Sequence, residues 1–285
     1  MLVYFNNFWN GFLEETDPVN ARFFIKLLSE VYNTEIYCSN NPDDATILVE
    51  SIFGNNSFIE YKSWKSTFLF TGESYYSDCA KKYLHLYTCI VGFQKTHNNF
   101  VECPLFIPYI VCNAYQYEPV TTVPSHSASV IISNGSGHVR NLFLNKLEQK
   151  INLFYGGNYK NNIGGTIPGL YNSINTINFY KQTKFAVTME NSIEDYYITE
   201  KIINGFRAGT IPIYWGSSNI IKYFNPKRFL LLENSSDDAI SNLIDKITNM
   251  SDHEYLSIVC EPIFNIPFDI LFNTVVTSIK SIIYR

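Results

Sequence analysis

The sequence predicts an α/β protein with parallel sheets, organised as two domains. Short apolar runs alternate with segments of helical period from one end of the chain to the other, which is typical of strands joined by crossover helices. The chain has 285 residues, enough for one large domain or two of moderate size. Near its middle, residues 117–125 contain two prolines and no periodicity, as expected of an interdomain linker.

The predicted first domain spans residues 1–120. Strands are expected where short runs of β-branched and aromatic residues end in polar or glycine-containing turns. These runs are 2–8, 34–38, 45–49, 67–71 and 88–92. A pattern of helical period predicts a helix at 19–32.

The predicted second domain spans residues 126–265 and continues the alternation. Its expected strands are 128–133, 152–155, 185–189, 210–214 and 228–232. Its expected helices are 137–150, 174–182, 196–207 and 236–250. In the last segment, 266–285, apolar residues recur at helical spacing, and we expect a helix that braces the domains.

Composition excludes several classes of protein. Asp and Glu number 26 against 21 Lys and Arg, for a formal charge of −5 and a pI near 5.6, so the basic surface of a nucleic-acid-binding protein is missing. The six cysteines form no CxxC pair and are expected to be reduced thiols. The N-terminus lacks the features of a signal peptide, and no apolar run is long enough to span a membrane. We therefore expect a soluble, cytoplasmic protein without a transmembrane segment or a nucleic-acid partner.

The segment most suggestive of chemistry is 184–201, where a buried strand ends in a polar loop and then enters a helix. Asp195 is expected to cap that helix. The free N–H groups of the first turn, together with Lys201, would form a cradle for a diphosphate. Asn191 and the hydroxyl of Tyr197 would add neutral hydrogen bonds.

Three further observations each leave an alternative open. Glu200 and Lys201 fall on the polar side of the predicted helix, so a solvated helix face is the alternative to a binding site. Glu73 follows the predicted strand 67–71, where a carboxylate can act as a general base, although most glutamates at strand ends are only solvated. The loop 156–165 is rich in Gly and Asn but fits neither a Walker loop nor GxGxxG, so an ordinary surface loop is equally compatible with it.

Taken together, these segments resemble the α1,3/4-fucosyltransferases of glycosyltransferase family 10, most closely the bacterial Lewis-antigen type. The resemblance covers essentially the whole chain, is strongest in the block 185–217 and is weak between Cys112 and Ala128. The matching stretches are 190–192, 197–201, 210–217 and 224–229 in the second half, and 71–73, 91–93 and 104–105 in the first.

The resemblance implies the GT-B class: two Rossmann-like domains facing a central cleft. The C-terminal domain would hold the donor, GDP-β-L-fucose, and the N-terminal domain would bind an oligosaccharide or glycoconjugate acceptor. The reaction would be an inverting transfer to a hydroxyl, such as O3 or O4 of an N-acetylglucosamine-type residue. Such a displacement needs a base for the acceptor proton and a counter-charge for the departing GDP.

The same resemblance assigns roles to single residues. Glu73 is the proposed base, and Lys201 would pair with the donor phosphates. Asn191 and Tyr197 would hydrogen-bond to phosphate or fucose oxygens. Glu200 would accept from ribose or fucose hydroxyls. These roles require that Glu73 and Lys201 face the same gap.

One departure from the family concerns an arginine that its members supply to the diphosphate from a Gly-rich loop. The matching place here is assigned to Lys160, which keeps the charge but loses the bidentate fork. This predicts weaker donor binding or an altered donor preference, with Lys160→Arg as the test. No DxD motif occurs, so we expect no metal site and no cofactor requirement beyond the donor itself.

Two alternatives to a fucosyltransferase remain at this point. One is a related GT-B transferase with a different donor or acceptor. The other is a non-catalytic module that binds a nucleotide sugar or a glycan, which would not need a carboxylate at Glu73. A hydrolase is disfavoured because the sequence shows no second carboxylate placed to activate water.

Overall fold

The computed structural model describes residues 1–73, 75–93, 97–113 and 120–285. The chain forms two compact units. The first unit comprises Met1–Asn113, Glu194–Tyr197 and Pro267–Arg285, and the second comprises Ala114–Ile193 and Ile198–Ile266. Part of the expected linker, residues 117–119, lies outside the described residues. Residues 120–125 form no helix or strand.

The first unit is built on a six-stranded sheet in which every pairing is parallel. Its strands are β1 (Leu2–Asn6), β2 (Tyr37–Ser39), β3 (Ile47–Ser51), β4 (Ser66–Phe70), β5 (Cys89–Gly92) and β6 (Phe100–Glu102). They lie in the order β2-β1-β3-β4-β5-β6. The helices of this unit are α1 (Arg22–Tyr32), α2 (Asp78–Tyr83), α3 (Phe106–Cys112) and α10 (Phe268–Ile283).

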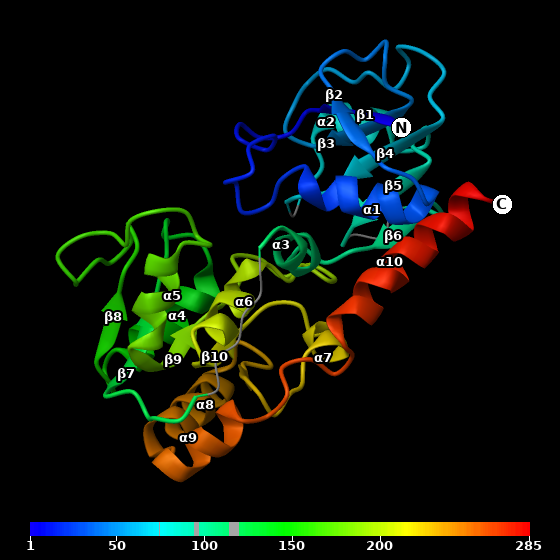
Figure 1. Ribbon diagram of the computed structural model, residues 1–285. Coiled ribbons are helices and arrows are strands. Elements are labelled where there is room, and N and C mark those ends of the chain that lie inside the picture. The colour runs from blue at the N-terminus through cyan, green and yellow to red at the C-terminus, as the bar shows by residue number, and fades with distance from the viewer. Residues whose placement is uncertain (74, 94–96, 114–119) are drawn as a thin grey trace. The chain divides into compact units, whose positions relative to one another are not determined.

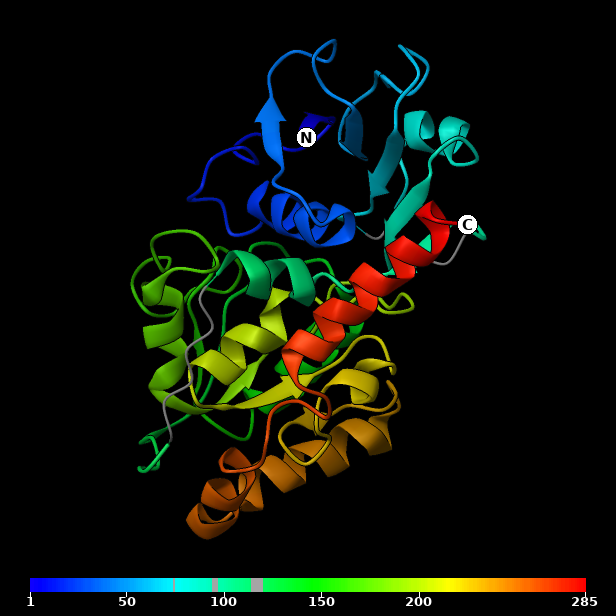
Figure 2. The same cartoon turned by 45° about the vertical axis from the view of Figure 1, so that its right-hand side comes forward.

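Helix α10 belongs to the first unit although it is the last element of the chain. It lies beside α1 and contacts β6 (Figures 1 and 2). Its buried residues are Leu271, Phe272, Val275, Val276 and Ile279. The ammonium of Lys26 on α1 lies 5.1 Å from the centroid of the Phe272 ring. The apolar stripe predicted for the C-terminus therefore packs against α1 and β6.

The second unit is built on a five-stranded sheet, again with every pairing parallel. Its strands are β7 (His126–Val130), β8 (Leu153–Tyr155), β9 (Thr183–Val187), β10 (Ile211–Tyr214) and β11 (Leu230–Leu231). Its helices are α4 (His138–Leu147), α5 (Ile174–Lys181), α6 (Glu200–Arg207), α7 (Ile220–Tyr223), α8 (Asp237–Asn249) and α9 (Asp252–Val259).

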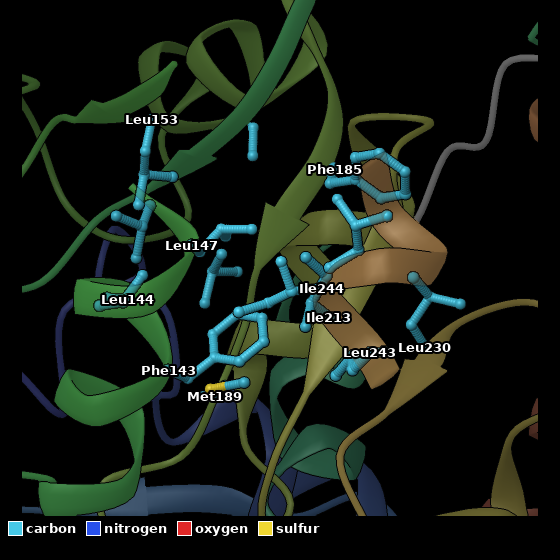
Figure 3. Close-up of a cluster of buried hydrophobic side chains, with 14 of the residues drawn as sticks. Phe143, Leu144, Leu147, Leu153, Phe185, Met189, Ile213, Leu230, Leu243 and Ile244 are labelled. Carbon is cyan, nitrogen blue, oxygen red and sulfur yellow. The ribbon is translucent and has the colours of Figure 1, made fainter. Parts of the chain in front are cut away.

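Alternate residues of β9 pack against helices on opposite faces of this sheet, because successive side chains of a strand point to opposite sides. Phe185 and Val187 belong to a core shared with α4 and α8, whereas Ala186 packs with residues of α5. Figure 3 shows the larger core, in which side chains of α4 and α8 meet those of the strands. Residues labelled there are Phe143, Leu144, Leu147, Leu153, Phe185, Met189, Ile213, Leu230, Leu243 and Ile244.

The strand order places a topological switch point in each sheet. In the second unit the order is β11-β10-β9-β7-β8, so the chain moves outward in one direction from β7 to β8 and in the other from β9 onward. Loops that leave the carboxyl ends of β7 and β9 consequently diverge, and open α/β sheets bind ligands in the crevice formed there. The corresponding point of the first unit lies between β1 and β3.

Most predicted elements are present within a few residues of their expected bounds, but one helix start is wrong. The helix expected at 196–207 begins at Glu200, and its N-cap is Thr199 rather than Asp195. Tyr196 adopts a left-handed conformation with φ of 60°, which a helix cannot contain. The sequence also missed five short elements: β6, α2, α3, α7 and α9.

The cysteines and the helix lengths bear on two further predictions from the sequence. All six cysteines are free, and two of them, Cys38 and Cys260, are exposed. Within the described ranges, every helix is too short or too polar to cross a membrane.

Candidate functional site

Side chains that follow β7 and β9 meet at the switch point of the second unit. We call this set the switch-point cluster; its members are Arg140, Glu190, Asn191, Thr199 and Lys201. Arg140 lies in the first turn of α4, which follows the loop after β7. The other four lie in the loop after β9 and in the start of α6. Their common position at the carboxyl ends of two diverging strands is the position at which such folds bind ligands.

Arg140 is the buried cation of this cluster. Only 3% of the residue is exposed, and its Nη1 donates to Oδ1 of Asn191 at 2.5 Å. Its Nη2 donates to the backbone carbonyl oxygens of Asn134, at 3.2 Å, and Ser136. Its Nε has no hydrogen-bond partner among the described residues. Burial lowers the pKa of the Arg140 guanidinium, and the Glu190 carboxylate opposes that shift.

Gly137 makes the approach of this guanidinium possible. Its φ of +97° is left-handed, and a Cβ there would lie 3.3 Å from the guanidinium carbon of Arg140. The residue before the first turn of α4 therefore has a backbone conformation that favours glycine over other residues. Arg140 is in this way folded back over the loop that precedes its own helix.

Glu190 is the buried anion of the cluster, and it connects the end of β9 with the start of α6. Its Oε1 accepts from the backbone N of Thr199 at 2.8 Å and from Thr199 Oγ1 at 2.9 Å. Its Oε2 lies 3.0 Å from Nζ of Lys201. Lys201 Nζ also donates to Thr199 Oγ1 at 3.0 Å. Burial raises the pKa of the Glu190 carboxyl, and the charge of Lys201 opposes that shift.

Asn191, Glu200 and Lys201 are the residues of this region that are accessible to solvent. Glu200 is the first residue of α6, and its Oε1 lies 3.6 Å from Nζ of Lys201. The Glu200 side chain is 23% exposed and the Lys201 side chain 27%. Asn191 is exposed while its Oδ1 is held by Arg140. The region thus offers cationic and N–H donors together with a carboxylate acceptor. A nucleotide sugar needs both, since its phosphates accept and its hydroxyls donate.

Tyr197 and Glu73 come together within the first unit, which includes the short segment Glu194–Tyr197. The Tyr197 hydroxyl donates to Oε2 of Glu73 at 3.4 Å, and its ring lies 5.0 Å from that of Phe93 in an edge-on arrangement. Tyr197 is buried, whereas Glu73 is only half-buried. Glu73 is therefore partly accessible to solvent, and the Tyr197 hydroxyl lies beside its carboxylate.

Aromatic rings adjoin the residue before Glu73. A Cβ on Gly72 would lie 3.3 Å from the ring of Phe53 and 3.6 Å from that of Trp9. These two rings meet each other edge to face at 5.4 Å. The surroundings of Gly72 are thus aromatic, and one of these rings, Phe53, is 39% exposed.

Lys160 is not brought to the switch-point cluster. Its Nζ lies 3.1 Å from Oε1 of Glu148 and donates to Oδ1 of Asn145 at 2.5 Å. Glu148 is the C-cap of α4, whereas Arg140 lies in the first turn of that helix. About 12 Å of helix separates the two positions. The arginine that contacts Asn191 therefore comes from the start of α4, whereas Lys160 contacts residues at the end of the same helix.

Sequence reasoning missed Arg140 and gave Glu190 no role. A signal for Arg140 exists in the sequence, because Arg140, Phe143, Leu144 and Leu147 share one face of α4, and all four are buried. A charged residue on the apolar face of a predicted helix is uncommon and needs a buried partner. Glu190 carries no comparable signal, since its partner Thr199 is defined only by the folded loop.

Comparison with known proteins gives one family match and a set of fucosyltransferase relatives. Residues 124–257 match the family described as glycosyltransferase family 10 (fucosyltransferase), C-term. The α-(1,3)-fucosyltransferase FucT of Helicobacter pylori is 26% identical over 300 aligned residues, covering 90% of this chain and 58% of that protein. The human 4-galactosyl-N-acetylglucosaminide 3-α-L-fucosyltransferase 9 is 29% identical over 154 residues, or 52% of this chain and 39% of that protein. This chain thus spans less than two thirds of the length of either relative.

Among solved structures, a crystal structure of an α1,3-fucosyltransferase with GDP-fucose superposes with a TM-score of 0.71. The match covers 100% of this chain and 90% of that one, at 20% sequence identity. Likeness at this level of identity shows the fold. The predicted GT-B class, with two parallel-sheet α/β domains, is confirmed.

Proposed function

We propose that this chain, which carries the C-terminal domain of glycosyltransferase family 10, transfers L-fucose from GDP-β-L-fucose to a hydroxyl of a glycan. The observation that carries the proposal is the Arg140–Asn191 contact across the switch point, beside the Glu190–Lys201 ion pair. It puts two cations where an α/β sheet holds a phosphate-bearing ligand. The fucosyltransferase relatives, one of them solved with GDP-fucose, support the choice of donor.

The donor would be held by residues of the second unit, with one contribution from the segment 194–197. Lys201 and Arg140 would neutralise the diphosphate, and the N-terminus of α6 would add backbone N–H groups. Asn191 and Tyr197 would hydrogen-bond to phosphate or fucose oxygens. Glu200 would accept from a ribose or fucose hydroxyl. All of these groups are donors or acceptors of the kind that a nucleoside diphosphate sugar presents.

The transfer itself would be a single inverting displacement with Glu73 as the base. The acceptor oxygen forms a bond to C1 of fucose while the bond from C1 to the phosphate oxygen breaks. The acceptor proton passes to the Glu73 carboxylate, and GDP leaves with the electron pair of the broken bond. The β-linked donor thus yields an α-L-fucoside. The name of the human relative supports O3 of an N-acetylglucosamine-type residue as the acceptor hydroxyl, with O4 as the second choice.

A donor and acceptor screen tests this proposal. GDP-fucose, GDP-mannose and UDP-sugars are each incubated with the chain and a panel of N-acetylglucosamine-containing glycans, and products are detected by mass. We expect transfer from GDP-fucose. Transfer only from another donor would favour a related GT-B transferase instead. Binding of GDP-fucose without transfer to any acceptor would favour a non-catalytic module.

Lys160→Met is expected to change the affinity for GDP-fucose by less than about twofold, because Lys160 belongs to an ion pair near the surface. Isothermal titration calorimetry of the variant against the parent chain measures this. A tenfold loss of affinity would restore Lys160 to the donor site that the sequence assigned to it, and Lys160→Arg would then be the next substitution to measure.

Fucose transfer is expected to continue at an undiminished rate in excess EDTA. The reason is that Arg140, Lys201 and the N-terminus of α6 supply the positive charge that the departing GDP requires. Initial rates in EDTA, and after addition of Mg²⁺ or Mn²⁺, provide the measurement. A rate that disappears in EDTA and returns with a divalent cation would contradict the proposed metal independence.

A further inference from the structure

Glu190 is a buried carboxylate that the proposed reaction does not use. The residue is 1% exposed and its side chain 0%, so it has no surface with which to touch a substrate. Among the described residues, its carboxylate contacts groups at the start of α6: the backbone N and hydroxyl of Thr199, and the ammonium of Lys201. Burying a charge is costly unless it is paired and hydrogen-bonded. Here the pairing is directed entirely at the residues that would meet the donor.

These contacts close a loop at its base. Glu190 follows β9, and Thr199 is the N-cap of α6, so the bonds between them join the two ends of the loop 191–198. Glu190 is also tied to the sheet, because its backbone N donates to the carbonyl oxygen of Trp215 at 2.8 Å. The place where α6 begins is consequently defined by a side chain anchored at the strand end.

The same carboxylate restrains the ammonium of Lys201. A lysine ammonium has three N–H donors on a flexible four-carbon stem. Here the ammonium lies 3.0 Å from Glu190 Oε2 and 3.0 Å from Thr199 Oγ1. Both acceptors are buried, so these contacts restrict the rotamers of the lysine stem. Preorganisation of this kind increases affinity because the ordering cost does not fall on the binding step.

We propose that Glu190 is a positioning residue, which holds the ammonium of Lys201 in place for the diphosphate of the donor. The inference rests on the proposed function, because it takes Lys201 as a phosphate-binding residue. Glu190 acts through Lys201 and does not touch the donor. Its contribution should therefore disappear when the Lys201 ammonium is removed.

A double-mutant cycle on GDP binding tests this dependence. The dissociation constant of GDP is measured by calorimetry for the full chain and for Glu190→Gln, Lys201→Met and the double variant. We expect Glu190→Gln to weaken binding by about tenfold, as for loss of a hydrogen bond to a charged group. The double variant should bind no more weakly than Lys201→Met alone, since coupled residues are not additive.

Glu50→Gln is the matched control for loss of a buried carboxylate. Glu50 is 0% exposed and lies in the first unit at the end of β3, where Asn6, Ser57, Tyr87 and the backbone of Phe58 donate to it. Its replacement is expected to lower the melting temperature and to leave GDP affinity unchanged. An effect of Glu190→Gln on affinity that Glu50→Gln lacks is therefore not a general effect of lost stability.

Thr199 provides a second route if Glu190→Gln does not fold. Thr199→Val removes the hydroxyl that bridges Glu190 and Lys201 at nearly constant volume, and Thr199→Ser retains it. We expect weaker GDP binding for Thr199→Val and the parent affinity for Thr199→Ser.

Unchanged or tighter GDP binding in Glu190→Gln would overturn the inference, and Thr199→Val takes its place if Glu190→Gln does not fold. Additive losses of affinity in the double variant would also overturn it. The proposed function fails separately, if the parent chain itself binds no GDP.

Discussion

Glu73→Gln is expected to reduce kcat for fucose transfer by about 10²- to 10⁴-fold, the usual contribution of a positioned general base. Glutamine has nearly the same shape as glutamate but cannot accept the acceptor proton. Affinity for GDP should remain within about twofold of the parent value, since Arg140 and Lys201, the proposed phosphate ligands, belong to the second unit. Single-turnover transfer and GDP calorimetry on the same preparation give the two quantities.

The control for this substitution is Glu30→Gln, on the exposed side of α1, which should retain full activity. Tyr197→Phe tests the contribution of the Tyr197 hydroxyl, which lies 3.4 Å from the Glu73 carboxylate. A Glu73→Gln variant with the parent kcat would remove Glu73 from the mechanism. The non-catalytic alternative would gain if the parent chain bound GDP-fucose and neither it nor any variant transferred fucose.

The second large effect is expected at Arg140. Arg140→Met should weaken binding of GDP-fucose by about 100-fold or more, because it removes both a charge and the bond to Asn191. Arg140→Lys keeps the charge but cannot reproduce the fork that bonds Asn134, Ser136 and Asn191 together. We expect an intermediate loss for the lysine variant, on the order of tenfold.

Lys160→Met, at the other end of α4, is the matched control for Arg140→Met. Donor affinity should fall for Arg140→Met and stay near the parent value for Lys160→Met. Circular dichroism identifies any variant that has lost its fold. Parent-like affinity in Arg140→Lys together with a loss in Lys160→Met would reverse the assignment made from the geometry of α4.

The sequence predicted the class of the fold well because its main signals are local. In the runs 45–49 and 185–189, residues 47–49 and 185–187 are apolar and buried on both faces of the strand, as is typical of strands covered on two sides. Some short elements were not predicted, because a local signal needs several residues. Helix α7 has four residues and β6 three, which is too few for a period to be visible.

The candidate site was predicted less completely, because its geometry depends on contacts distant in sequence. The start of α6 is defined by the Glu190–Thr199 bonds and by the left-handed Tyr196, and no capping pattern in the sequence reports either. Asp195 has a side chain that can cap a helix, but the left-handed Tyr196 follows it and α6 begins only at Glu200. Lys160 was assigned from its place in a glycine-rich loop, whereas the folded loop pairs it with Glu148.

The position of α10 has a consequence for how the protein is made. The sheet of the first unit is complete by Glu102, yet α10, which covers α1, begins only at Phe268. During synthesis from the N-terminus, the whole second unit leaves the ribosome before that cover is available. The half of the protein that emerges earliest is therefore completed last, and a ribosome stalled before Phe268 would present α1 without the helix that packs beside it.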